Sequence, residues 1–225
     1  MRQRDTNPGF TLIEMAVVVA IVGILAALGA TTLVRSNPRA RLAATSTELH
    51  ALLRNARLNA LATGRATIVA FFPEQASSRG GVGRVVVLED PTGTFFTSGA
   101  AVNLSSYDPA AGVFGDEVLA SLDFPPGVVL ASAPGAPDAF LAPFQRIPVG
   151  DCTFCSSGAG ARGAVRFDGR GRATFFSTAG APLDTWGASL ALSARSSRAS
   201  PPLVDGVRLF VITAGTGGVK SFVRG

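Results

Sequence analysis

The chain contains few of the side chains that enzymes commonly use for catalysis. Its 225 residues include one histidine, two cysteines, one lysine and one tryptophan, and only 16% of the residues are charged. It has neither a Gly-x-Ser-x-Gly nucleophile motif nor a Walker phosphate-binding loop. A Ser-His-Asp triad needs a histidine beside its nucleophile, and the single histidine falls on a predicted structural helix. The sequence therefore predicts a protein that is not an enzyme and needs no cofactor.

The two cysteines, Cys152 and Cys155, stand in a segment rich in glycine and serine. A structural zinc site would need two further ligands, and the only histidine, His50, is distant in sequence. A thioredoxin-type redox pair lies at a helix start, whereas glycine and serine flanks favour a loop. The favoured interpretation is a small-loop disulfide without a metal. A redox pair, a metal site and free thiols stay open as alternatives.

Charge is nearly absent from residues 10–34, an apolar stretch with one carboxylate, Glu14, at its head. As a helix rising about 1.5 Å per residue, this stretch is long enough to span a bilayer. The polar leader, residues 1–9, carries arginines that favour a cytoplasmic N-terminus. A secretory signal is cleaved after its apolar region, whereas here Gly9 precedes that region. A lipid-facing charge costs about 2.5–3.5 kcal/mol, so Glu14 is expected to have a function and a partner.

Residues 9–14 read Gly-Phe-Thr-Leu-Ile-Glu, which resembles the signature of type IV pilins and type II secretion pseudopilins. The resemblance implies cleavage between Gly9 and Phe10 by prepilin peptidase, N-methylation of Phe10, and a mature chain of residues 10–225. It also implies that Glu14 neutralises the terminal amine of a neighbouring subunit during assembly.

A second helix is predicted over residues 38–63. Asn37 is the expected N-cap, Pro38 suits the first helical position, and Gly64 suits the C-cap. Helical spacing places five apolar residues on one face: Leu42, Leu49, Leu53, Ala56 and Ala60. Residues 10–63 are therefore expected to form a stem whose first half is embedded in the membrane.

The segment that runs from this helix into the following predicted strand carries a second resemblance. Leu49, Leu53, Ala56, Arg57 and Ala60, followed by a predicted strand, are similar to the GspH/FimT-type domain of minor pilins and minor pseudopilins. The implied fold class is α+β, with a long N-terminal helix packed on an antiparallel β-sheet or β-sandwich. The expected parts are the leader 1–9, a transmembrane assembly helix 10–34, its periplasmic continuation 35–65 and a globular β-rich domain 66–225.

Runs of β-branched and aromatic residues bounded by turn residues predict eight strands. They cover residues 67–72, 84–89, 128–131, 164–167, 173–177, 188–193, 207–213 and 219–223. Asp168-Gly169 predicts a hairpin turn between the fourth and fifth of these strands. The last two strands form a similar hairpin through a glycine-rich turn, and residues 92–148 are interpreted as long loops with short strands.

Charge is distributed unevenly along the rest of the chain. Residues 66–159 have a net charge of −6, whereas residues 160–225 have a net charge of +6. This distribution suits head-to-tail contacts between subunits, or an anionic partner.

Some competence pilins of this family bind DNA through a C-terminal Gly-Arg-x-Arg motif. At the corresponding position of the final predicted hairpin, residues 217–220 read Gly-Gly-Val-Lys, with Lys220 in place of the second arginine, so that motif is degraded. A literal Gly-Arg-x-Arg occurs earlier, with Arg170 and Arg172, and Arg162 and Arg166 precede it. These side chains could hold phosphates. A solvated hairpin tip or a subunit contact is the favoured interpretation, and DNA is not expected as a partner.

The resemblance implies a minor pilin in a complex that primes or caps a type IV pilus. A minor pseudopilin of a type II secretion system, and less so a DNA-binding competence pilin, remain alternatives. The implied partners are prepilin peptidase, other pilins or pseudopilins, a tip adhesin, and inner-membrane lipid before assembly. The implied location is the inner membrane, with the C-terminal domain in the periplasm, and then the tip of the fibre.

Overall fold

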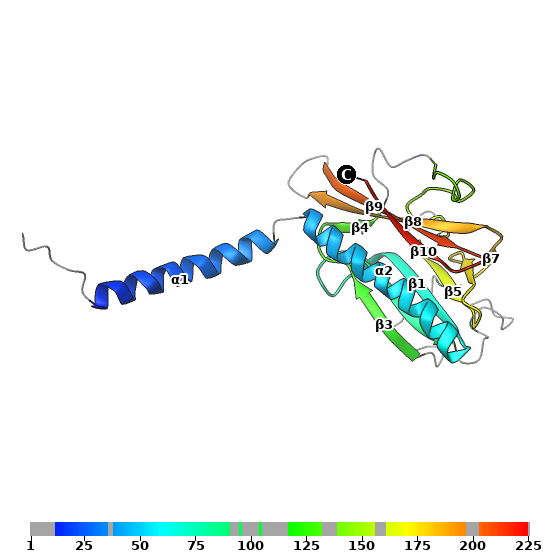
Figure 1. Ribbon diagram of the computed structural model, residues 1–225, viewed down its shortest axis with the longest axis horizontal. Coiled ribbons are helices and arrows are strands. Elements are labelled where there is room, and N and C mark those ends of the chain that lie inside the picture. Colours follow the sequence, from blue (N-terminus) through cyan, green and yellow to red (C-terminus); the bar gives the residue numbers. More distant parts are fainter. Residues whose placement is uncertain are drawn as a thin grey trace, which may run out of the picture. The chain divides into compact units, whose positions relative to one another are not determined.

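The chain forms two compact units, Met1–Asn37 and Pro38–Gly225. The computed structural model describes residues 12–35, 38–90, 95, 104, 117–131, 139–155, 161–196 and 203–224. The first unit contains helix α1 (Leu12–Arg35). The second contains helix α2 (Pro38–Thr63) and two antiparallel sheets, and in Figure 1 α2 lies across their strands. The predicted α+β class is confirmed.

The described strands of the second unit pair only in antiparallel fashion. The larger sheet has the order β3 (Glu117–Asp123), β2 (Val82–Asp90), β1 (Ala66–Ala76), β5 (Gly163–Phe167), β6 (Ala173–Phe176), β7 (Pro182–Leu183). The smaller sheet has the order β10 (Val219–Arg224), β9 (Leu203–Thr213), β8 (Gly187–Ser196), β4 (Val128–Leu130). Each of the eight predicted strands corresponds to an observed one, whereas β3 and β7 were not predicted.

The main core lies where α2 meets both sheets. The predicted apolar face of α2 is confirmed, since all five of its residues are buried: Leu42, Leu49, Leu53, Ala56 and Ala60. They share one hydrophobic cluster with residues such as Phe71 and Val85 of the larger sheet and Leu190 and Phe210 of the smaller one. Burying a leucine or phenylalanine side chain contributes about 1.5–3 kcal/mol to stability. The contacts of α2 with both sheets therefore hold the sheets together.

Each sheet is also covered on its outer face. In β1, Val69 and Phe71 face the main core, while Ile68, Ala70 and Phe72 belong to a second cluster that includes the loop residues Phe95 and Leu104. A third cluster, with Phe140 and Ile147, covers the outer face of the smaller sheet. Because both faces of β1 are buried over residues 68–72, this part of the strand is a continuous apolar run without polar alternation.

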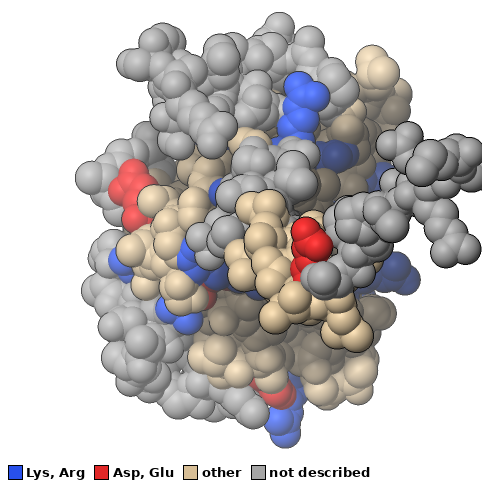
Figure 2. Space-filling view, turned by 90° about the vertical axis from the view of Figure 1, so that its left-hand side faces the viewer, with Lys and Arg blue, Asp and Glu red and all other residues tan. Residues whose placement is uncertain are grey.

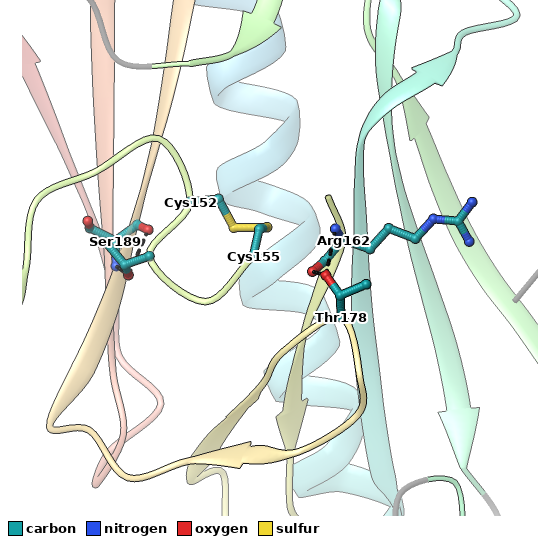
Figure 3. The surroundings of a disulfide bond; sticks show 6 residues. Cys152, Cys155, Arg162, Thr178 and Ser189 are labelled. Carbon is teal, nitrogen blue, oxygen red and sulfur yellow. Dashed lines mark hydrogen bonds between the residues drawn. A yellow bond between two sulfur atoms is a disulfide. The ribbon is translucent and has the colours of Figure 1, made fainter. Parts of the chain in front are cut away.

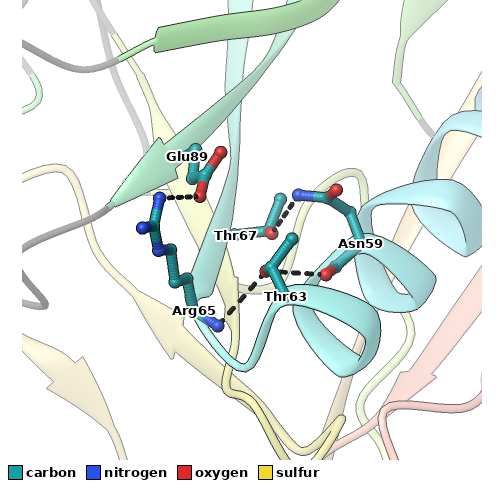
Figure 4. Close-up of polar contacts among 5 residues, drawn as sticks. All are labelled: Asn59, Thr63, Arg65, Thr67 and Glu89. Carbon is teal, nitrogen blue, oxygen red and sulfur yellow. Dashed lines mark hydrogen bonds and ion pairs between the residues drawn. The ribbon is translucent and has the colours of Figure 1, made fainter.

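The junction between α2 and β1 is fixed by a glycine cap and a short series of polar contacts. Gly64 has φ of 71° and its N–H donates to the carbonyl of Ala60, as predicted for a C-cap. On the two sides of this cap, Asn59 of α2 donates to the hydroxyl of Thr67 in β1 at 3.2 Å, and Arg65 pairs with Glu89 of β2 at 3.1 Å (Figure 4). The predicted N-cap, Asn37, lies outside the described residues.

The two predicted hairpins belong to different sheets, and their turns meet. The N–H of Ala173 donates to the carbonyl of Ala214 at 2.9 Å, which links the β5–β6 hairpin to the β9–β10 hairpin. A Cβ atom added at Gly217 would lie 2.1 Å from the carbonyl oxygen of Gly171. Arg57 of α2 donates to the same Gly171 carbonyl at 3.2 Å. The helix α2 and the two hairpin turns therefore meet at Gly171 and Gly217, and a side chain at position 217 would not fit there.

Candidate functional site

Helix α1 presents a nearly continuous apolar surface. Ten of the fourteen side chains at positions 12–25 are large and hydrophobic, and each is at least half exposed within this chain. They are Leu12, Ile13, Met15, Val17, Val18, Val19, Ile21, Val22, Ile24 and Leu25. So much apolar surface on one helix is unfavourable in water, so we expect other apolar groups to cover it.

The residues of the predicted processing site precede α1. Gly9 and Phe10 lie outside the described residues, so the structure does not place the cleavage site. Glu14 lies in the first turn of α1. A carboxylate there interacts favourably with the partial positive charge at the helix N-terminus.

The helical part of the predicted membrane segment is confirmed, because α1 is a helix of 24 residues. Within the described ranges, however, no helix combines the length and the apolar character that crossing a membrane requires. The membrane-spanning part of the prediction is therefore not confirmed.

Cys152 and Cys155 form a disulfide, as the favoured sequence interpretation predicted. Their short loop lies between the two sheets with α2 behind it (Figure 3). Phe154, between the two cysteines, packs against the rings of Phe71 and Phe175 at centroid distances of 5.2 and 5.7 Å. The disulfide thus stabilises a turn that inserts an aromatic side chain into the main core.

The loop that carries the disulfide is also attached to the smaller sheet. The N–H of Thr153 donates to the Ser189 carbonyl at 2.9 Å, and the N–H of Ser189 donates to the Thr153 hydroxyl at 2.9 Å. A Cβ atom at Gly163 would lie 3.1 Å from the Cys155 sulfur and 2.8 Å from the Phe154 ring. This tight packing gives the disulfide a structural role.

The basic residues considered for DNA contact do not form one surface. Arg162 donates to the Leu104 carbonyl at 2.6 Å and lies over the Phe72 ring, on the outer face of the larger sheet. Lys220 lies over Phe144, which packs on the outer face of the smaller sheet.

The other three arginines lie along β5 and its turn. Arg166 is a half-buried residue within β5, whereas Arg170 and Arg172 belong to the β5–β6 turn. Arg162 precedes β5, so about 20 Å of extended chain separates it from that turn. The structure brings Arg170 and Arg172 together but leaves Arg162 and Lys220 elsewhere.

Acidic and basic side chains are also intermixed on the molecular surface that Figure 2 shows. Among the described residues of this face, blue and red groups lie scattered among uncharged ones. Binding to a phosphate backbone depends on clustered cations, and the described residues of this face show no such cluster.

The turn from β5 to β6 is organised by Asp168. Its carboxylate accepts the backbone N–H groups of Arg170 and Arg172, both at 2.9 Å, and pairs with the Arg172 guanidinium at 2.8 Å. Phe167 pairs with Ala173 and the N–H of Asp168 donates to the Arg172 carbonyl at 3.0 Å, so the hairpin predicted at Asp168-Gly169 is confirmed. The N–H of Gly171 also donates to the Asp168 carbonyl at 2.7 Å, so the Asp168 side chain adds to the backbone hydrogen bonds of this turn.

We expect the contribution of Asp168 to stability to depend on pH. Burial raises the pKa of its carboxyl, but hydrogen bonds from the backbone and guanidinium of Arg172 and the backbone of Arg170 outweigh burial and hold the pKa below 3.8. The ionised carboxylate therefore stabilises the fold above about pH 4, and this stabilisation is lost as the pH falls through the lowered pKa. Asp168→Asn should lower the melting temperature at pH 7, with a difference that shrinks toward pH 2.

Asp184→Asn is the matched control for this prediction, because Asp184 is exposed and its replacement removes the same charge. Thermal unfolding of the three proteins between pH 2 and pH 7 measures the effect. A difference between Asp168→Asn and wild type that stays constant with pH would contradict the role given to this carboxylate.

Comparison with known protein families identifies one pattern at the N-terminus. Residues 5–30 match the prokaryotic N-terminal methylation motif, so the chain carries a type IV prepilin-like signal. The match covers Gly9, Phe10 and Glu14, and it supports a type IV pilin-like protein that interacts with prepilin peptidase and other pilins. Searches of the curated proteins and of the solved structures find no significant match.

Proposed function

We propose that the protein is a minor pilin, a structural subunit of a complex that initiates or caps a type IV pilus. The observation that carries this proposal is the N-terminal methylation motif at residues 5–30. In this role prepilin peptidase cleaves after Gly9, and Phe10 becomes the methylated N-terminus. The chain resides in the inner membrane through α1 before it joins the fibre, and the second unit lies in the periplasm.

The apolar surface of α1 supports assembly through this helix. Its large hydrophobic side chains are exposed in the single chain, and packing against lipid and then against neighbouring helices would cover them. Cleavage at Gly9 creates a new amine at Phe10, four residues before Glu14. A carboxylate in an apolar environment is costly unless it is paired, so Glu14 selects a partner that supplies the amine.

The globular unit supports recognition of neighbouring subunits over catalysis. Its core is built from α2 and two sheets, and its disulfide stabilises a core turn. The GspH/FimT type of minor pilin, proposed from the α2 face, has a helix packed on antiparallel strands, which this unit also has. The specificity of the subunit would reside in the exposed loops and edge strands of this unit.

Removing the Glu14 charge tests the proposed assembly role. Glu14→Ala should leave the protein in the membrane fraction with a folded second unit. When a tagged form of the protein is crosslinked to its neighbours and purified, the recovery of partner pilins should fall by about tenfold or more. The reason is that the amine that pairs with Glu14 would be left as an unpaired buried charge, which costs about 3–5 kcal/mol. Glu48→Gln, an exposed charge change on α2, is the control and should leave recovery unchanged.

The identity of the recovered proteins separates the two fibre types. Pilus subunits in the crosslinked material support the minor pilin, whereas secretion components would assign the chain to a pseudopilus. Unchanged recovery with Glu14→Ala would refute charge pairing as the basis of assembly.

A further inference from the structure

A cleft of about 220 Å³ lies between α2 and the edge of the smaller sheet. Its lining consists of Ala43, Ser46, Thr47, His50, Arg208 and Ser221. One of these side chains is a guanidinium, one is an imidazole, three carry hydroxyls, and none is acidic. We call this the Arg208 cleft.

The sequence of α2 explains one wall of the Arg208 cleft. Ala43, Ser46, Thr47 and His50 are spaced by three, one and three residues, which places them on one stripe of the helix. This stripe is polar and half-exposed, whereas Leu42, Leu49 and the other buried residues occupy the neighbouring face.

The opposite wall follows from strand alternation in β9 and β10. Phe210 and Ile212 of β9 face the main core under α2, so Arg208, which lies two and four residues earlier, is on the same face of the strand. Ser221 of β10 pairs with Phe210, and Val219 packs against the same core. The Arg208 guanidinium and the Ser221 hydroxyl therefore both face the helix.

Three of the five polar side chains in the Arg208 cleft are available to a ligand as hydrogen-bond donors. The hydroxyls of Ser46 and Thr47 donate to the Ala43 carbonyl at 2.8 and 3.0 Å. In the part of the chain that the structure describes, His50, Arg208 and Ser221 make no side-chain hydrogen bond or ion pair. The guanidinium of Arg208 is half-buried and has neither a carboxylate nor a carbonyl partner among the described residues. Hydrogen bonds from a charged donor are about twice as strong as neutral ones, so this group favours binding of an anion.

We propose that the Arg208 cleft binds a single phosphate-type oxyanion, either free inorganic phosphate or the phosphodiester of an anionic lipid headgroup. The Arg208 fork donates two hydrogen bonds to two oxygens of the ion, and the His50 ring and the Ser221 hydroxyl donate to the others. The volume fits one such ion with a few waters, since a water occupies about 30 Å³. This site does not depend on the pilin-like role of the protein.

Calorimetric titration of the full chain in uncharged detergent micelles, at constant ionic strength, tests the site. Inorganic phosphate is one titrant, and micelle-dispersed phosphatidylglycerol, with phosphatidylcholine as its blank, is the other. We expect saturable binding of at least one of them with one site per chain. Arg208→Gln should weaken this binding about tenfold or more, and His50→Gln should weaken it about threefold to tenfold.

Arg54→Gln is the matched control, because it removes the same charge from an exposed position of α2 that does not line the cleft. Arg208→Lys keeps the charge but loses the fork, and it should bind with intermediate affinity. Binding of phosphate alone identifies a free ion, and binding of phosphatidylglycerol alone identifies a headgroup. The proposal is overturned if neither titrant binds saturably, or if Arg54→Gln weakens binding as much as Arg208→Gln in folded protein.

Discussion

Replacing Gly217 by alanine should lower the free energy of unfolding by about 2–4 kcal/mol. The new Cβ atom would lie 2.1 Å from the Gly171 carbonyl oxygen, which already accepts a hydrogen bond from Arg57. Gly217 also has φ of 59°, in the left-handed region that favours glycine. The clash can be relieved only by moving the β9–β10 turn away from the β5–β6 turn and α2.

Gly215→Ala is the matched control in the same turn. No atom lies within 4 Å of its added Cβ, and its φ is not in the left-handed region, so its effect should stay within about 0.5 kcal/mol. Thermal unfolding of both variants in detergent measures the difference. Gly217→Ala should melt about 5–15 °C below wild type, and a melting temperature equal to that of Gly215→Ala would show that the turns do not depend on this contact.

A bulky residue at Gly9 should abolish processing of the precursor. If prepilin peptidase cleaves between Gly9 and Phe10, the residue before the scissile bond enters a site shaped for a residue without a side chain. Each added carbon in such a pocket reduces turnover about 10- to 200-fold, so Gly9→Ala should be cleaved poorly and Gly9→Val should accumulate uncleaved. The ratio of precursor to mature protein on an immunoblot measures the effect.

Gly23→Ala tests whether the loss is specific to the cleavage site. Gly23 lies in α1, and nothing lies within 4 Å of its added Cβ within the chain. Cleavage of this variant should equal that of wild type. Normal cleavage of Gly9→Val would contradict the assigned processing site.

Elements whose apolar pattern is visible within a short stretch of sequence could be predicted. The spacing of Leu42, Leu49, Leu53 and Ala56 on one helical face was sufficient to predict the buried side of α2. The strands β1 and β2 were equally clear, because both contain unbroken apolar runs. Cys152 and Cys155 are close enough in sequence that a disulfide was the favoured interpretation before the fold was known.

Two strands whose sequences carry no clear apolar pattern, β3 and β7, were not predicted. The strand β3 carries exposed side chains such as Val118 and Leu119 at the edge of its sheet, and it reads as a mixed polar segment until β2 pairs with it. The hairpin after β5 was predicted from Asp168-Gly169, but the two backbone N–H groups that the Asp168 side chain accepts were not.

The proposed functional residues divide in the same way. Gly9, Phe10 and Glu14 belong to one continuous motif, so roles for them could be predicted from sequence alone. His50 and Arg208 are 158 positions apart, and each reads singly as a surface residue of its own element. They line one cleft because α2 packs against β9 and β10, and no local sequence pattern indicates this packing.

The most direct test of the type IV pilin-like assignment is the mass spectrum of the N-terminal peptide. The protein should be isolated from membranes of cells that contain prepilin peptidase. The assignment predicts a peptide that begins at Phe10 and carries one additional methyl group on its terminal amine. An N-terminus at Met1, or at any residue other than Phe10, would contradict it.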